Sequence, residues 1–344
     1  MGAKAARLWR RHVTGLPDLP ASVRAALHDE PVPDWRAPTL ATLTENRFSD
    51  PRWIFERKFD GMRCLAFRDG DRVRLLSRNR QPLNGTYPEL VDALGAQQTT
   101  RFVVDGEVVA FVGRRTSFGR LQGRLGITKP EVARASPVRV FYYVFDLLHV
   151  GGESTIELPL LWRKKLLRKV IDFDDPLRYT THRVSDGLTA YRAACARGDE
   201  GVIAKLADSK YDGRRSPNWL KFKCVRDQEF VVGGYTSPKG SRIELGALLL
   251  GYHEGGDLVY AGKVGTGFDA PTLHRLHERL SPIERDSPPF DRGLVRQSGA
   301  RWVRPELVVQ IGFSEWTRDG KLRHPRYLGL RTDKDPADVV REMR

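Results

Sequence analysis

The sequence predicts an α+β protein in which an antiparallel-sheet domain is followed by a small β-barrel. Three observations carry this prediction. Short strand–turn units, in which β-branched and aromatic residues alternate with polar ones, recur between residues 53 and 152. Two segments with helical periodicity follow, at 158–171 and 187–199, without the regular strand–helix alternation of a parallel sheet. Beyond residue 227 the strands are separated by glycine-rich turns, which is typical of a barrel of about five strands.

The individual elements follow in order along the chain. A helical pattern around 21–29 and several prolines predict a lead-in segment over residues 1–38. The main domain is expected over 39–226. Within it, the "RDGDR" stretch is a hairpin turn, because the Asp69-Gly70 pair provides the positive φ of a tight loop. The barrel domain is expected over 227–344, with "PTLHRLHERL" as its helix.

Composition narrows the class of protein. The chain has 344 residues and a formal net charge of +15, which indicates a polyanionic partner. The surplus is uneven, since residues 1–224 carry 39 Lys and Arg against 26 Asp and Glu, whereas 225–344 carry 19 against 17. No apolar run is long enough to span a membrane and no secretory leader is visible, so we expect a cytoplasmic protein without membrane contact.

Three cysteines lie far apart in the sequence: Cys64, Cys195 and Cys224. An odd number without CxxC spacing predicts neither a zinc cluster nor a disulfide framework, and it suits a reducing compartment.

One short stretch, "FERKFDGMRC", places Lys58 two residues from both Glu56 and Asp60 and five before Arg63. Taken alone, it fits an exposed strand of mixed charge. It also fits a nucleophilic lysine in a phosphate-binding pocket. An amine attacks phosphorus only in its free form, and the flanking carboxylates would raise its pKa. They must therefore point elsewhere, or be offset by a metal and by arginines.

Five further stretches favour the catalytic interpretation when they are taken together. Each has a structural explanation of its own: a strand-edge carboxylate, a turn residue, a core aromatic or a solvated basic face. As a set they provide carboxylates for a divalent metal, an aromatic plate for a base, and cations for a triphosphate. The candidate residues in these stretches are Arg78, Glu107, Phe145, Glu200, Lys205, Lys221 and Lys223.

The chain resembles the covalent nucleotidyltransferases, and most closely the ATP-dependent DNA ligases of the bacterial ligase D type. The resemblance runs from about residue 38 to 340 and rests on motifs in the family's order. These are "KFDGMR" at 58–63, "SR" at 77–78, "DGEVV" at 105–109, "YYVFDLL" at 142–148, "EGVIAK" at 200–205, "KFK" at 221–223 and "RHPRYLGLRTDK" at 323–334. It implies a nucleotidyltransferase domain followed by an OB-fold domain.

The resemblance also implies a role for each residue at a motif position. Lys58 would carry AMP as a phosphoramide, Glu56 would contact the adenine amino group, and Phe145 would stack on the base. Ribose and phosphate contacts would come from Arg63, Arg78, Glu107, Lys221 and Lys223, and the metal contacts from Glu107 and Glu200. Arg78 and Lys205 would bind DNA. Arg331, Asp333 and Lys334 would orient the leaving pyrophosphate, and Asp227 would lie at the hinge.

The activity implied is the sealing of nicks in duplex DNA through a lysyl-AMP enzyme and a DNA-adenylate. The cofactors would be ATP with Mg²⁺ or Mn²⁺. The expected setting is DNA repair or end joining by a monomer at the bacterial nucleoid, with a Ku-like end-binding protein as a possible partner. Because the chain shows neither an N-terminal DNA-binding domain nor a fused polymerase or nuclease, a stand-alone ligase core is expected.

Three other interpretations remain open on the sequence. An RNA ligase or an mRNA-capping-type guanylyltransferase would share the lysine motif. Glu56 argues against capping, and so do the barrel stretches "VVGGYTSPKGSR" and "YAGKVGTGF", which look like those of the ligase D type. The "RTDK" of the barrel argues for DNA. A non-catalytic nucleic-acid-binding protein on a degenerate ligase fold would be expected to have lost Lys58 or its glutamates, and all are present.

Overall fold

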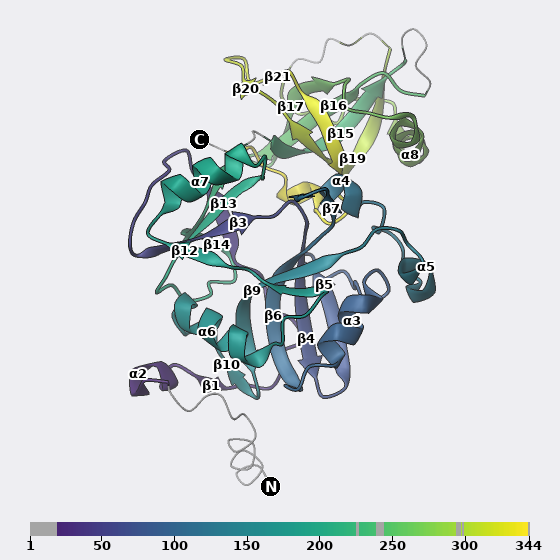
Figure 1. Ribbon diagram of the computed structural model, residues 1–344. Helices are drawn as coiled ribbons and strands as arrows, with labels where there is room; N and C mark the ends of the chain where they lie inside the picture. Colours follow the sequence, from purple (N-terminus) through teal and green to yellow (C-terminus); the bar gives the residue numbers. More distant parts are fainter. Residues whose placement is uncertain (1–18, 225–226, 239–243, 294–296, 298, 343–344) are drawn as a thin grey trace. The chain divides into compact units, whose positions relative to one another are not determined.

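The computed structural model describes residues 19–224, 227–238, 244–293, 297 and 299–342 (Figure 1). The chain divides into two compact units, one that ends at Cys224 and one that follows it. Much of the expected lead-in, residues 1–18, lies outside the described residues. In the rest of it the helical pattern yields only the short α2 (Ala21–Arg24), followed by β1 (His28–Asp29).

The first unit contains a seven-stranded sheet with the path β1-β10-β9-β6-β4-β5, in which β11 also pairs with β9. All pairs in it are antiparallel except β11 with β9. The remaining strands of this sheet are β4 (Met62–Asp69), β5 (Arg72–Ser77), β6 (Arg101–Val109), β9 (Phe141–Val150), β10 (Glu153–Ser154) and β11 (Leu177–Tyr179).

A second, five-stranded sheet in the same unit has the order β12-β3-β13-β14-β2. It is antiparallel apart from the β14–β2 pair. Its strands are β2 (Leu40–Leu43), β3 (Trp53–Lys58), β12 (His182–Val184), β13 (Gly201–Leu206) and β14 (Arg215–Lys223).

The three longer helices of this unit pack on the outer faces of these two sheets (Figure 1). Helix α6 (Leu160–Val170) packs against β9, and α7 (Gly187–Ala196) packs against β13 and β3. The other short elements of the unit are α3 (Pro88–Gly95), α4 (Phe118–Leu121), α5 (Pro130–Arg134) and the β7–β8 pair (Phe111–Val112, Arg115–Thr116).

Three apolar clusters follow from this layering. The largest lies under α3 and α6 on one face of the seven-stranded sheet. A second, which includes Phe55 and Phe222, lies between the five-stranded sheet and α7. The third joins the inner faces of the two sheets and includes Leu65, Phe145 and Trp219. Because successive side chains of a strand point to opposite faces, every other residue of β3, β4, β6, β13 and β14 points into the space between the sheets.

The second unit is built on a six-stranded antiparallel sheet with the path β17-β16-β15-β19-β18, in which β22 pairs with β19. Together with its helix it forms the OB-fold domain. Its elements are β15 (Asp227–Thr236), β16 (Leu248–Glu254), β17 (Asp257–Val264), α8 (Ala270–Leu280), η1 (Ser281–Ile283), β18 (Glu284–Arg285), β19 (Ala300–Gly312), β20 (Glu315–Trp316), β21 (Leu322–Arg323), β22 (Arg326–Leu330) and η2 (Pro336–Asp338).

The expected α+β class with antiparallel sheets is confirmed. Gly70 has a φ of +62° in the turn between β4 and β5, as the Asp-Gly hairpin requires. The helix expected at 271–280 is α8, which begins one residue earlier. Residues 239–242 of the barrel stretch "VVGGYTSPKGSR" (231–242) lie outside the described residues. No helix in the part of the chain that the structure describes has the length and apolar character needed to cross a membrane.

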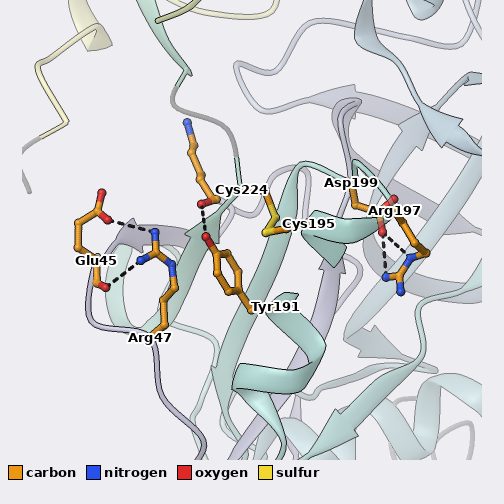
Figure 2. The surroundings of a disulfide bond; sticks show 8 residues. Glu45, Arg47, Tyr191, Cys195, Arg197, Asp199 and Cys224 are labelled. Carbon is orange, nitrogen blue, oxygen red and sulfur yellow. Dashed lines mark hydrogen bonds and ion pairs between the residues drawn. A yellow bond between two sulfur atoms is a disulfide. The ribbon is translucent and has the colours of Figure 1, made fainter. Parts of the chain in front are cut away.

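The expectation that the cysteines form no disulfide is wrong. Cys195, in the last turn of α7, is bonded to Cys224, directly after β14, with a Cα–Cα distance of 5.2 Å. Figure 2 shows the bond beside Tyr191, whose hydroxyl donates to the carbonyl oxygen of Lys223 at 3.2 Å. The two cysteines are 29 residues apart, and they meet only because α7 packs against the sheet that contains β14. Cys64 is a buried free thiol.

Reduction of the Cys195–Cys224 bond is expected to lower the free energy of unfolding by about 3 kcal/mol, because the bond closes a loop of moderate length in the unfolded chain. Denaturant unfolding with and without a thiol reductant measures the difference. A Cys195→Ser/Cys224→Ser variant should unfold at the lower denaturant concentration in both conditions. Equal stability of the unmodified protein in both conditions, with three titratable thiols after unfolding without reductant, would show that the bond is absent.

Candidate active site

Lys58 is the last residue of β3, an interior strand of the five-stranded sheet. Phe55 of the same strand packs in the cluster beneath α7. Strand alternation therefore turns Glu56 and Lys58 toward the other face, into the space between the two sheets. In register, Lys58 pairs with Gly201 of β13 and Glu56 pairs with Ile203. The strand ends at Lys58, so Asp60 does not share this face as an unbroken strand would have required.

The three carboxylates near Lys58 have separate partners. The Lys58 ammonium forms an ion pair with Glu200, which lies just before β13. The Asp60 carboxylate accepts a hydrogen bond from the backbone N–H of Phe118 at 2.9 Å. Glu56 lies between two other lysines. Glu200, far away in the sequence, thus contacts the Lys58 ammonium, whereas the Glu56 carboxylate is turned toward Lys164 and Lys205.

Glu56 is buried and is paired with two ammonium groups. One oxygen, Oε1, contacts Lys164 Nζ, and the other, Oε2, lies 2.7 Å from Lys205 Nζ. Burial acts to raise the pKa of Glu56, but the charges of Lys164 and Lys205 outweigh it and hold the pKa below its usual value. For Lys205, burial prevails over the attraction of Glu56 and lowers the pKa to about 8. Glu56 is thus an ionised carboxylate in a dry environment.

The seven-stranded sheet contributes Arg63 and Phe145 to the same space. The Arg63 guanidinium donates two hydrogen bonds to the fully buried Asp105 and a third to the carbonyl oxygen of Thr39 at 3.2 Å. Tyr211 also donates to Asp105, at 2.6 Å. Asp105 therefore fixes the orientation of Arg63, whose guanidinium carbon lies 4.7 Å from the centre of the Phe145 ring.

Phe145 is surrounded by cations and one aromatic ring. Its ring is 7% exposed, and Lys205 Nζ lies 4.1 Å from the ring centre. The indole of Trp219 meets it edge-on at 6.0 Å. Both Arg63 and Lys205 are thereby held close to the residue that is expected to stack on the base. The face of the Phe145 ring can attract a cation and can also stack on a flat base.

The remaining expected residues of this unit lie around the same space. Lys221 and Lys223 alternate with Phe222, which packs beneath α7, so they share the inner face with Trp219. Glu107 of β6 lies directly across from Arg63 of β4 in register. Arg78 is half-buried and follows the last residue of β5. Lys205 is only 2% exposed, which favours a role within the pocket over the expected DNA contact.

The expected pyrophosphate residues of the second unit form a cluster of their own. Arg331 donates two hydrogen bonds of 2.8 Å to the buried Asp333. Burial acts to raise the pKa of Asp333, but Arg331 outweighs it and lowers the pKa. Glu229 of β15 lies 3.2 Å from Lys334 Nζ and 3.7 Å from Arg331. Asp227, the expected hinge residue, is the first residue of β15.

The carboxylates around Lys58 fit a metal that is held mainly by the nucleotide and water better than one that is held by protein ligands alone. Within the described ranges, no group of three or more His, Cys, Asp or Glu residues is arranged to hold a metal ion. The Glu200 carboxylate already contacts a cation, the Lys58 ammonium. Mg²⁺ commonly takes one or two carboxylates and completes its shell with phosphate oxygens and water. Glu200 and Glu107 would be the two carboxylates of such a site.

Sequence reasoning missed three residues that organise this space: Lys164, Asp105 and Tyr211. A signal for Lys164 was present, because Arg163 and Lys164 occupy the i+3 and i+4 positions after Leu160, where an amphipathic helix normally has apolar residues. Asp105 likewise stands among valines in "VVDGEVV". Tyr211 comes from a loop after β13, and no local pattern distinguishes it.

Comparison with known proteins identifies the family. A family profile described as "ATP dependent DNA ligase domain" matches residues 38–223, and one described as "ATP dependent DNA ligase C terminal region" matches 241–334. The chain belongs to the ATP-dependent DNA ligases. Together with the two-sheet domain and the OB-fold domain, this confirms the expected family and fold.

Curated ligase D proteins are similar over most of the chain. The "Multifunctional non-homologous end joining protein LigD" of Pseudomonas aeruginosa is 38% identical over 322 residues, which cover 91% of this chain and 37% of that protein. Its Mycolicibacterium smegmatis counterpart is 37% identical, with coverage of 90% and 40%. The ligase thus spans about two fifths of the length of these relatives.

A solved structure described as "mycobacterial DNA ligase D complexed with ATP and MES" superposes with a TM-score of 0.63 at 35% identity. The match covers 89% of this chain and 98% of that one.

The titration of Lys205 is expected to make this ligase more stable at high pH relative to a variant without the amine. The folded protein releases this proton near pH 8 and the unfolded chain only near 10.5, so between these values the unfolded state binds more protons. The contribution of Lys205 to the free energy of unfolding therefore increases as the pH rises above 8, and decreases as the pH falls.

Thermal unfolding from pH 7 to 9.5 of the ligase and of Lys205→Met tests this. The difference in Tm should move in favour of the unmodified protein as the pH increases. A Lys165→Met variant, which lacks an exposed lysine of α6, should show a constant difference. A constant difference for Lys205→Met as well would contradict the lowered pKa.

Proposed function

We propose that this ligase seals nicks in duplex DNA by way of a covalent lysyl-AMP on Lys58. The observation that carries the proposal is the position of Lys58. It ends an interior strand, faces the space between two sheets, and contacts Glu200 while its sequence neighbours Glu56 and Asp60 are engaged elsewhere. A lysine in that position can lose its proton and attack once a nucleotide or metal has displaced or neutralised Glu200.

The first step forms a bond between Lys58 Nζ and the α-phosphorus of ATP. The bond from that phosphorus to the bridging oxygen breaks, pyrophosphate leaves with the electron pair, and Lys58 releases a proton to solvent. Lys221 and Lys223 on the inner face of β14 would balance the charge that develops on the α-phosphate. A metal held by Glu200 and Glu107 would add Lewis-acid stabilisation of the same phosphate oxygens.

Two further transfers complete the proposed cycle. An oxygen of the nick's 5′-phosphate attacks the AMP phosphorus, the P–N bond breaks, and Lys58 regains a proton. The 3′-hydroxyl then attacks the activated 5′-phosphate, and AMP leaves as the phosphodiester forms. Arg78, half-buried at the end of β5, is the proposed contact of the 5′-phosphate. The positive surplus of residues 1–224 favours duplex phosphates without sequence preference.

We propose a different role for each of the two units. Residues 39–226 would act as the adenylation domain and 227–344 as the OB-fold domain, with Asp227 at the hinge. Arg331, Asp333 and Lys334 would orient pyrophosphate, which leaves in the first step only. Three steps with different partners require domain reorientation.

The biological setting follows from the names of the relatives. Proteins described as non-homologous end joining LigD are 36–38% identical to this chain, so we propose a role in double-strand break repair. A Ku-like end-binding partner, a monomeric ligase and a place at the cytoplasmic nucleoid go with that role. The family match favours DNA joining over an RNA ligase, a capping guanylyltransferase or a non-catalytic binding protein.

Replacing Lys58 by alanine is expected to abolish covalent labelling, because the proposed phosphoramide bond forms at the Lys58 nitrogen. The protein, stripped of any AMP already bound, is incubated with α-labelled ATP and a divalent metal, denatured, and assayed for label on the chain. Label from ATP in the unmodified protein and none in Lys58→Ala supports the proposal. Label from GTP alone would indicate capping chemistry, and no label from either would refute the lysyl-AMP step.

Replacing Lys334 by alanine is expected to slow adenylation by about 10²-fold or more while leaving the sealing of a pre-adenylated nick within a few-fold of normal. The reason is that pyrophosphate takes part only in the first transfer. Single-turnover rates for the two reactions are compared with those of Lys263→Ala, a matched lysine of the same unit on β17. Equal losses in both reactions would contradict the assignment to the first step.

A further inference from the structure

Helix α6 presents two adjacent basic residues to the interior of the adenylation domain. Arg163 and Lys164 are both almost fully buried, at 0% and 1% exposure. They occupy the same helical stripe as the buried Leu160 and Leu167. The next residue, Lys165, is exposed, and its ammonium lies over the ring of Trp162. The burial is therefore specific to the first two positions and is not a property of every basic residue in the helix.

Each of the two buried cations pairs with a carboxylate of a different sheet. Arg163 donates to both oxygens of Asp146 at 2.7 and 2.9 Å, and Asp146 belongs to β9 of the seven-stranded sheet. Lys164 contacts Glu56, which belongs to β3 of the five-stranded sheet. Two successive residues of one helix thus tie together the two sheets that enclose the proposed nucleotide pocket.

The Lys164 ammonium has acceptors for all three of its N–H groups. Besides Glu56, it donates to the carbonyl oxygen of Thr180 at 3.0 Å and approaches that of Phe145 at 3.4 Å. An ammonium group has three donors and no acceptor. All three donors of Lys164 are therefore used by groups of the protein. Lys164 can fix the position and charge of Glu56, but it has no donor left for a nucleotide base.

Glu56 is consequently a carboxylate that can only accept hydrogen bonds. Its two oxygens contact Lys164 and Lys205, and each oxygen has lone pairs beyond those contacts. Removing Lys164 would leave Lys205 as the remaining cation against this buried carboxylate, and a buried carboxylate with less compensating charge takes up a proton more readily. A protonated Glu56 would be a donor as well as an acceptor.

We propose that Lys164 is a positioning residue for base selection, which keeps Glu56 an acceptor-only carboxylate so that the pocket takes a purine with an amino group at position 6. This inference rests on the proposed function, in which Glu56 faces the adenine of ATP. The 6-amino group of ATP donates to such a carboxylate. The 6-carbonyl of GTP would place acceptor against acceptor and is rejected. Without Lys164, a protonated Glu56 could donate to that carbonyl.

The test compares nucleotide use by Lys164→Met with that by the unmodified ligase and by Lys165→Met, the exposed neighbour on the same helix. Lysyl-nucleotide formation is followed with labelled ATP and labelled GTP, and kcat/KM is obtained for each. We expect the ATP-to-GTP ratio of kcat/KM to fall about tenfold or more in Lys164→Met, in line with the loss of a charged hydrogen bond. Lys165→Met should keep the ratio of the unmodified protein.

Three further variants make the result decisive. Lys164→Arg retains the charge and should restore most of the ratio, which a purely packing role would not predict. Lys164→Gln removes the charge with less change in shape, and serves if the methionine variant does not fold. Glu56→Gln imitates a protonated Glu56 with every lysine in place and should lower the ratio in the same way.

The outcomes separate this inference from the proposed function. If the unmodified protein forms no covalent nucleotide, the proposed function fails before base selection is tested. If it is labelled by ATP and the folded Lys164→Met or Lys164→Gln keeps the normal ratio, Lys164 does not act in base selection. An unchanged ratio in Glu56→Gln would overturn the inference even if both lysine variants fail to fold.

Discussion

The first structural unit depends on buried carboxylates that must each be matched by a cation. Asp105, Asp146 and Glu56 lie in or beside the space between the sheets with almost no exposure. Their partners are Arg63, Arg163, and the lysine pair Lys164 and Lys205. Replacing a whole buried ion pair by apolar residues often leaves the free energy of unfolding unchanged. Removing only one partner lowers it strongly, because the other charge stays buried without compensation. We therefore regard these pairs as devices that fix geometry.

The geometry that they fix is that of the proposed nucleotide site. Asp105 orients Arg63 against Phe145, and Asp146 lies next to Phe145 in the chain. Lys205 reaches both the Phe145 ring and Glu56. The aromatic residue expected to stack on the base is thus held by the same network that sets the charge of the residue expected to recognise its edge. A similar arrangement recurs in the second unit, where Arg331 is held by Asp333 with Glu229 nearby.

Local patterns predicted much of this structure and missed what depends on packing. The strands carrying Lys58, Glu107 and Phe145 follow from alternation and turn chemistry, and the hairpin at Gly70 is confirmed. The helical stripe of Leu160 indicates that Lys164 is buried, but no local pattern shows that Glu56 is the acid that it meets. The Cys195–Cys224 bond was not predicted either, because it depends on the packing of α7 against the sheet that contains β14.

The depth of the ion pairs also determines how the ligase responds to ionic strength. Mobile ions screen exposed charges over about 8 Å at physiological salt, but they penetrate little to pairs such as Lys164 with Glu56. Contacts with DNA phosphates release counterions and weaken steeply as salt increases. Added salt should therefore detach the enzyme from DNA while its choice of nucleotide stays the same. The salt concentration thus offers a way to study the two proposed activities, DNA binding and nucleotide selection, separately.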